Sequence, residues 1–93
     1  MTFKYDLSDE LEETLKKLHK KDNKRYEAAM KKIDEIAERD ETTIDFYKNL
    51  KHGLNDYKRV HIDKSFVLLF KVSKKEKFIL FDRLEHHDNI YKL

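Results

Sequence analysis

The sequence predicts an α+β domain in which an N-terminal strand and an antiparallel helical hairpin precede an antiparallel β-meander, with the helices packed on one face of the sheet. Two observations lead to this prediction. Apolar residues recur at helical spacing in the first half, and the second half holds two nearly unbroken apolar runs, FVLLFKV and KFILF. These runs also argue against a disordered chain, although 43% of the residues are charged. A chain of 93 residues is expected to form a single domain, 1–93.

The N-terminal segment predicts a short strand followed by an amphipathic helix. Residues Thr2–Asp6 alternate and place Phe3 and Tyr5 on one face, as in a strand. Ser8 is a favourable N-cap, and the helix is expected to end near Lys21, where basic residues suit its C-terminus. The apolar stripe of this helix consists of Leu7, Leu11, Leu15 and Leu18.

A second helix is expected directly after the first. Asp22 or Asn23 can cap its N-terminus, and the pattern extends to about Arg39 or Asp40. Because the connection is so short, the two helices are predicted to form an antiparallel hairpin. Its apolar stripe, which we interpret as core, consists of Tyr26, Met30, Ile33 and Ile36.

The segment 41–56 is less regular than the helices on its N-terminal side. Thr43 or Asp45 can start a short helical turn there. Gly53 is the only glycine in the chain, and Asn55 and Asp56 follow it. This combination predicts a turn that leads into the sheet.

Three strands are then predicted to form the meander. Residues Tyr57–Ile62 alternate, with one polar and one mixed face, and Phe66–Val72 reads as a central strand covered on both faces. Lys77–Phe81 is expected to be the last buried strand. Asp82–Leu93 is expected to leave the sheet as a polar tail, with a helical turn at Asp88–Tyr91.

The charge is unevenly distributed along the chain. The net charge is +2, but residues 47–93 carry 11 Lys and Arg against 6 Asp and Glu. This basic half favours an anionic partner, of which nucleic acid is the commonest, although lysines that only maintain solubility explain the charge equally simply. We expect a cytoplasmic protein with no membrane segment, because the chain has no Cys, no secretory signal and no long apolar run.

Several kinds of catalytic site are unlikely on composition alone. A single Gly excludes a glycine-rich phosphate loop, and the absence of Cys excludes thiolate metal ligands. His86, His87 and Asp88 are potential metal ligands, but adjacent histidines rarely form a metal site of the usual spacing. We therefore expect neither a metal nor a cofactor.

The remaining chemistry suits RNA. Neighbouring strands are expected to bring Lys58, His61 and the Arg83–Tyr91 segment to one concave surface. Cations offset phosphate charge, tyrosine stacks on bases, and histidine transfers protons near neutral pH. RNA also supplies its own nucleophile, the 2′-hydroxyl, so that no metal is required. The candidates are His61, Arg83, His86, His87 and Tyr91, with Lys48, Lys51, His52, Lys58 and Arg59.

Each of these residues taken alone also has a structural explanation. His61 is compatible with an ordinary surface position on a strand, and Tyr91 with a C-terminal anchor on the core. Arg83 has Asp82 and Glu85 nearby as ion-pair partners. The functional interpretation therefore depends on the set and not on any single member.

The segment LKHGLNDYKRVHIDKSFVLLFKV, followed by FDRLEHHDNIY, resembles the RelE/ParE superfamily of bacterial and archaeal toxins. The similarity is greatest to the RelE and YafQ-like branch, whose members cleave messenger RNA in the ribosomal A site. The order strand, two helices and three strands also resembles this superfamily. The resemblance implies a toxin of a type II toxin–antitoxin system that acts as an endoribonuclease.

The resemblance also implies roles for individual residues. His61, Arg83, His87 and Tyr91 match positions that bind the scissile phosphate, transfer protons and stack the base. Lys58 belongs to the same strand motif as His61, and Arg59 lies between them. The RNA-contacting loop of the family corresponds to Lys48, Lys51 and His52. Two positions depart from the family: Val67 stands where many RelE proteins carry Arg, and Ser65 where some YafQ-like members carry an acidic residue.

The implied partners are a cognate RelB-like antitoxin, the ribosome and messenger RNA, with DNA reached only through the antitoxin. Two other functions remain open on the sequence. One is a gyrase inhibitor of the ParE type, which shares the fold without needing proton-transfer residues. The other is a non-enzymatic module that binds RNA or protein.

Overall fold

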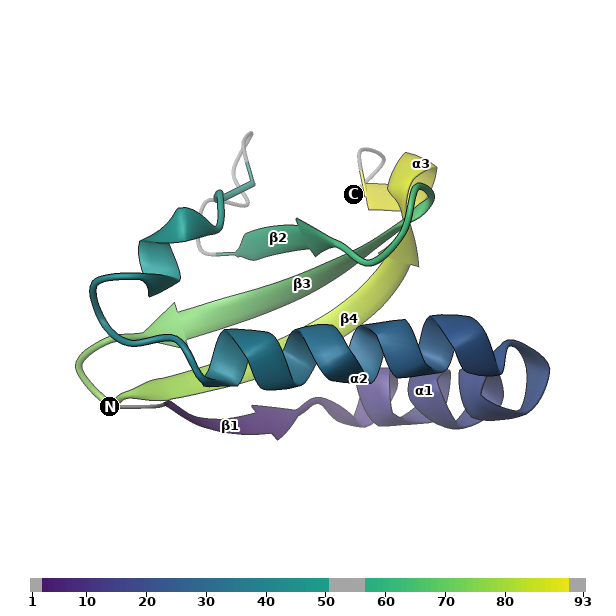
Figure 1. The fold of residues 1–93 in the computed structure, drawn as a ribbon, viewed down its shortest axis with the longest axis horizontal. Helices are drawn as coiled ribbons and strands as arrows, with labels where there is room; N and C mark the ends of the chain where they lie inside the picture. Colours follow the sequence, from purple (N-terminus) through teal and green to yellow (C-terminus); the bar gives the residue numbers. More distant parts are fainter. Residues whose placement is uncertain (1–2, 51–56, 91–93) are drawn as a thin grey trace.

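The computed structural model describes residues 3–50 and 57–90, which form a four-stranded sheet with two long helices (Figure 1). The elements in chain order are β1 (Lys4–Leu7), α1 (Asp9–Lys21), α2 (Asn23–Ala37), the 3₁₀ turn η1 (Ile44–Phe46), β2 (Lys58–His61), β3 (Phe66–Ser73), β4 (Phe78–His86) and α3 (His87–Ile90). The turn predicted around Gly53 lies outside the described residues.

The sheet has the strand order β1-β4-β3-β2. β2, β3 and β4 form an antiparallel meander, and β1 pairs in parallel with β4. Figure 1 shows α1 and α2 side by side, with α3 at the C-terminal end of β4. The predicted α+β fold is therefore confirmed, including the helical hairpin and the meander.

The two long helices begin at the predicted caps. The Ser8 hydroxyl accepts the Leu11 N–H at the start of α1, and the Asp22 carboxylate accepts the Arg25 N–H at the start of α2. α2 ends at Ala37, two to three residues earlier than its pattern predicts. The cause is Asp40, whose carboxylate accepts N–H and O–H bonds from the two threonines that follow it and so forms a turn.

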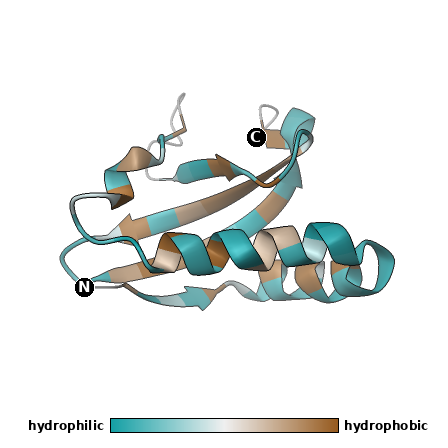
Figure 2. Ribbon diagram, viewed as in Figure 1, coloured by the Kyte–Doolittle hydropathy of each residue, from teal (hydrophilic) through white to brown (hydrophobic). Residues whose placement is uncertain are grey.

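The main core lies between the hairpin and one face of the sheet. Figure 2 shows hydrophobic residues along both the helices and the strands that contribute to it. Its fully buried members include Leu11, Ile33, Ile36, Leu68, Phe70, Ile79 and Phe81. A smaller apolar cluster covers the opposite face and consists of Leu50, Val67, Leu69 and Ile90, with Tyr57 packed against it. β3 is thus covered on both faces, as its unbroken apolar sequence predicts.

The prediction that Asp82–Leu93 leaves the sheet was wrong. β4 continues to His86, because a bulge opposite Leu69 and Phe70 accommodates Asp82 without breaking the pairing of Arg83 and later residues. Leu84 then packs into the main core, where it is almost fully buried. The predicted helical turn at Asp88–Tyr91 begins one residue earlier, as α3.

Among the described residues, no helix combines the length and the apolar character that crossing a membrane requires.

Candidate functional site

Two histidines stack where the end of β2 and the start of α3 come together. His61 is the last residue of β2, and His87 is the first residue of α3. Their ring centroids are 5.9 Å apart, with 26° between the ring planes. The backbone N–H of His87 donates to the carbonyl of Ser65 in the β2–β3 turn, at 2.6 Å. The structure therefore brings together two of the predicted catalytic residues.

The strand register places charged side chains on the same face as this pair. Arg59 lies opposite Leu69, which lies opposite Arg83. His61 lies opposite Val67, which lies opposite Glu85. Directly paired residues point to the same face, and two strand spacings separate the outer members of each row by roughly 10 Å.

The floor between these rows is apolar. Val67 and Leu69 are only 2% exposed, and they pack against Leu50 and Ile90 in the smaller cluster. Because Val67 and Leu69 are apolar, positive charge on this face comes from Arg59 and Arg83 on the strands on either side.

Arg83 is held by carboxylates. Its Nε is 3.3 Å from Oδ2 of Asp82 and 3.4 Å from Oε2 of Glu10. Partial burial acts to lower the pKa of Arg83, but Glu10, Asp82 and Glu85 together raise that pKa above its usual range. Arg59 differs, since no carboxylate of the described residues lies within ion-pair distance of it. Arg59 is therefore the cation on this face that is more available to an incoming phosphate.

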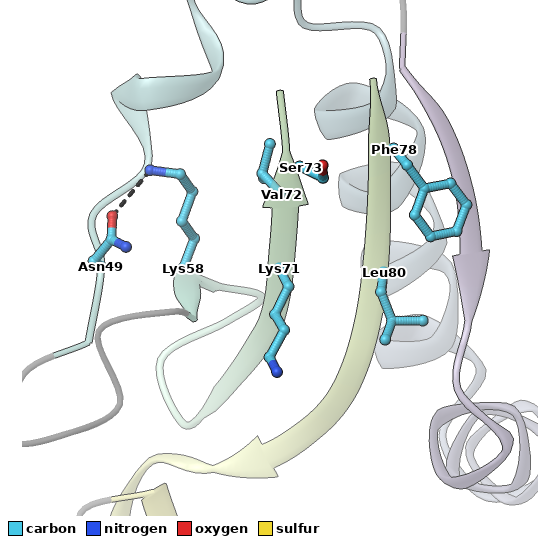
Figure 3. A pocket seen from close by; sticks show the side chains of 7 residues that line it. All are labelled: Asn49, Lys58, Lys71, Val72, Ser73, Phe78 and Leu80. Atoms are coloured by element: carbon cyan, nitrogen blue, oxygen red, sulfur yellow. Dashed lines mark hydrogen bonds between the residues drawn. The ribbon is translucent and has the colours of Figure 1, made fainter. Parts of the chain in front are cut away.

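Lys58 lies apart from the other predicted residues. Its side chain is on the helix side of the sheet, level with Phe70, and only 8% of the residue is exposed. Its Nζ donates to the carbonyl of Tyr47 at 3.1 Å and to Oδ1 of Asn49 at 3.0 Å (Figure 3). Asp45 is 3.5 Å away. These bonds tie the segment after η1 to the sheet.

The other predicted residues are distributed as follows. Lys48 is exposed and lies beside Arg59, whose N–H donates to the Lys48 carbonyl at 2.9 Å. His86 packs edge-on against Phe66, with ring centroids 5.5 Å apart, and so lies on the opposite face from His87. The described residues contain no group of three side chains suited to hold a metal ion. Lys51, His52 and Tyr91 lie outside the described residues.

Glu85 is a further charged residue on this face that the sequence pattern did not predict. It is half-buried and shares a row and a face with His61. The alternation in Asp82–His86 is the signal that identifies it, because alternate residues of a strand share a face. The prediction of a polar tail for Asp82–Leu93 hides this signal, because the alternation matters only if the strand continues to His86.

A hollow of about 470 Å³ lies where β2 and β4 begin and β3 ends (Figure 3), at the ends of these strands that are far from His61 and His87. It is lined by Asn49, Lys58, Lys71, Val72, Ser73, Phe78 and Leu80. Its lining combines apolar side chains with two lysines and contains no histidine or carboxylate. It therefore suits contact with a partner better than proton transfer.

Comparison with known proteins identifies the family. No protein-family model matches the chain. A protein of Methanocaldococcus jannaschii named "Putative toxin RelE4" is 47% identical over 90 residues, which cover 97% of this chain and 92% of that protein. This chain belongs to the RelE toxin family.

Solved toxin structures share the fold of this RelE-family chain at low sequence identity. The YoeB/ParE toxin of Agrobacterium tumefaciens superposes with a TM-score of 0.71 and 12% identity, over 90% of this chain and 98% of that one. A chain of the E. coli DinJ–YafQ toxin–antitoxin complex superposes with a TM-score of 0.65 and 15% identity, over 98% of this chain and 99% of that one.

Proposed function

We propose that this RelE-family chain is the toxin of a type II toxin–antitoxin system and cleaves messenger RNA in the ribosomal A site. The observation that carries the proposal is the stacked pair of His61 and His87 on the sheet face that α1 and α2 leave uncovered. Arg59 and Arg83 lie on the same face, which is what a phosphate-binding site needs.

The proposed reaction is attack of the RNA 2′-hydroxyl on the adjacent phosphorus. A base takes the proton of the hydroxyl, the P–O5′ bond breaks, and an acid protonates the departing oxygen. We assign these two proton transfers to His61 and His87, one to each. Arg59 and Arg83 stabilise the charge of the pentacoordinate phosphate, and Tyr91 stacks on a neighbouring base.

The RNA strand is proposed to approach along the edge of β2. Lys48 and Arg59 are adjacent there, and both are available to phosphates. Lys51 and His52, which precede β2 in the chain, extend the same basic segment. Lys58 is left out of the RNA contacts, since its Nζ already bonds to the segment after η1.

A cognate RelB-like antitoxin is the proposed partner. One of the structural neighbours is a toxin–antitoxin complex. Residues 47–93 of this chain carry an excess of positive charge, which suits an acidic segment of an antitoxin. Co-expression with the protein encoded beside it should yield a stable complex that no longer cleaves RNA. Failure of any neighbour-encoded protein to bind or neutralise the chain would contradict this assignment.

Toe-printing of translating ribosomes tests the proposed activity. Wild-type protein should cut messenger RNA within A-site codons. His87→Ala should abolish or weaken the cuts, and so should Tyr91→Ala, which removes the ring proposed to stack on the base. Intact messenger with wild-type protein would refute the nuclease proposal, and a DNA-supercoiling assay would then test gyrase inhibition. Loss of function in lysine variants but not in histidine variants would instead indicate a binding module.

A further inference from the structure

Arg25, in the first turn of α2, reaches across to the turn between β2 and β3. Its Nε donates to Oδ2 of Asp63 at 2.8 Å, and its Nη1 is 3.2 Å from Oδ2 of Asp22. The centre of its guanidinium group is 4.1 Å from the centroid of the Phe66 ring. A flat guanidinium can make all three contacts at once, which a lysine ammonium cannot.

Asp63 connects Arg25 to the backbone of the β2–β3 turn. While Oδ2 accepts from Arg25, Oδ1 accepts the N–H of Ser65 at 2.8 Å and the N–H of Phe66 at 3.0 Å. The hydrogen bond from Arg25 is the main cause that lowers the pKa of Asp63. The carboxylate therefore stays ionised and holds the turn in one conformation.

The same turn positions both histidines. His61 is the last strand residue before it, and the Ser65 carbonyl accepts the His87 N–H at 2.6 Å. One face of the sheet carries α2, and the other carries the histidine pair. The chain of contacts thus runs from α2 through the turn to the opposite face.

We infer that Arg25 is a positioning residue, which, through Asp63 and the β2–β3 turn, keeps His61 and His87 in contact. The geometric part of this inference stands on the contacts above. Its consequence for catalysis rests on the proposed function. Small displacements of proton-transfer groups are costly, since misplacement by about 1 Å can slow a reaction roughly 100-fold.

The test compares Arg25→Gln with Lys32→Gln. Lys32 is a matched control because it lies on the same helix, makes a 2.9 Å ion pair with Glu35, and has a side chain 29% exposed against 27% for Arg25. Nuclear Overhauser effects between the two imidazole rings report the contact directly. Single-turnover cleavage of ribosome-bound messenger RNA reports the chemistry.

We expect Arg25→Gln to weaken or abolish the ring–ring signal and to slow cleavage at saturating protein about tenfold or more. Lys32→Gln should leave the ring–ring signal and the cleavage rate unchanged. Compared with Arg25→Gln, Arg25→Lys should restore part of the signal and part of the rate, because lysine keeps the positive charge but not the flat group above Phe66. Asp63→Asn gives a second variant, which retains an acceptor for the turn and loses the ionic bond to Arg25.

An unchanged ring–ring signal in folded Arg25→Gln and Asp63→Asn would overturn the inference. A loss of this signal in Lys32→Gln as large as in Arg25→Gln would also overturn it. If the wild-type protein cleaves no messenger RNA, the proposed function fails, but the ring–ring signal still decides whether Arg25 positions the pair. The two failures are therefore distinguishable.

Discussion

His61 and His87 show what the sequence can predict about single residues. Alternation along Tyr57–Ile62 placed His61 on the polar face of its strand, and the family resemblance selected His87. Their proximity depends on the register of β2 with β3 and of β3 with β4, which the sequence pattern does not specify. The prediction therefore named the pair without predicting its contact.

Lys58 shows the opposite case. Its residue type suggested RNA binding, but in the structure it is buried and bonds to other residues of the protein. Lysine beside a strand histidine is plausible as a phosphate contact. Only the packing of the segment after η1 against β2 reveals that Nζ bonds to Tyr47 and Asn49. This contact joins β2 to a segment that comes earlier in the chain, and the sequence pattern does not show that the two pack together.

Lys58→Met should lower the free energy of unfolding by about 2 kcal/mol, because it removes the donor to buried acceptors. Urea denaturation measures this. Lys71→Met is the control on the neighbouring strand, since Lys71 is exposed, and it should change stability by less than about 0.5 kcal/mol. Equal, small effects of the two substitutions would show that the Lys58 bonds contribute nothing.

Asp63 predicts a defined dependence of stability on pH. Its pKa in the folded protein is lowered from 3.8, chiefly by the hydrogen bond from Arg25. A lowered pKa stabilises the folded state above the unfolded-state value, and that contribution is lost as the pH falls through the folded-state value. The stability difference between wild type and Asp63→Asn should be constant from pH 5 to 7 and shrink below about pH 4. A difference that does not change with pH would contradict this.

At the scale of elements, the helices were predicted well because their signals are local. Ser8 and Asp22 cap helices where capping residues were expected, and the apolar stripes face the core. β4 was predicted too short, because Asp82 and the polar residues after it look like a strand end. The bulge that lets the strand continue is a property of its pairing with β3 and leaves no clear sequence signal.

Ser8 links two elements and not only one helix. Its hydroxyl accepts the Leu11 N–H and donates to the carbonyl of Asp82, the bulge residue of β4. Ser8→Ala should therefore cost about 1–2 kcal/mol, as for a strong N-cap. Thr14→Ala, which removes an exposed hydroxyl within the same helix, is the control and should cost less than about 0.5 kcal/mol. Thermal denaturation of both variants checks this, and equal losses would argue against the link.

At the scale of the whole molecule, the order of elements and the family resemblance fixed the fold class, but not the place of β1. β1 is an edge strand, parallel to β4, which follows it by most of the chain length. Pairing between segments so distant cannot be inferred from local patterns. The basic character of residues 47–93, by contrast, is readable from the sequence and belongs to the half that carries the histidine pair.

That charge predicts how RNA binding responds to salt. Each phosphate contact in a single strand contributes about 0.7 to the slope of log K against log salt concentration. Arg59→Gln should lower the magnitude of the slope by about 0.7, whereas Lys58→Met should leave it unchanged because Nζ is not available to phosphate. Fluorescence anisotropy with a short single-stranded RNA measures both slopes. A larger change for Lys58→Met than for Arg59→Gln would reverse our assignment of the RNA contacts.

The most direct test of the account is single-turnover cleavage of messenger RNA on programmed ribosomes by wild type, His61→Ala, His87→Ala and the double variant. Because the two histidines are proposed to act as a unit, each single variant should lose most of the activity. The double variant should then be slower than the slower single variant by no more than about threefold. Cleavage at the wild-type rate by either single variant would contradict the proposed pair.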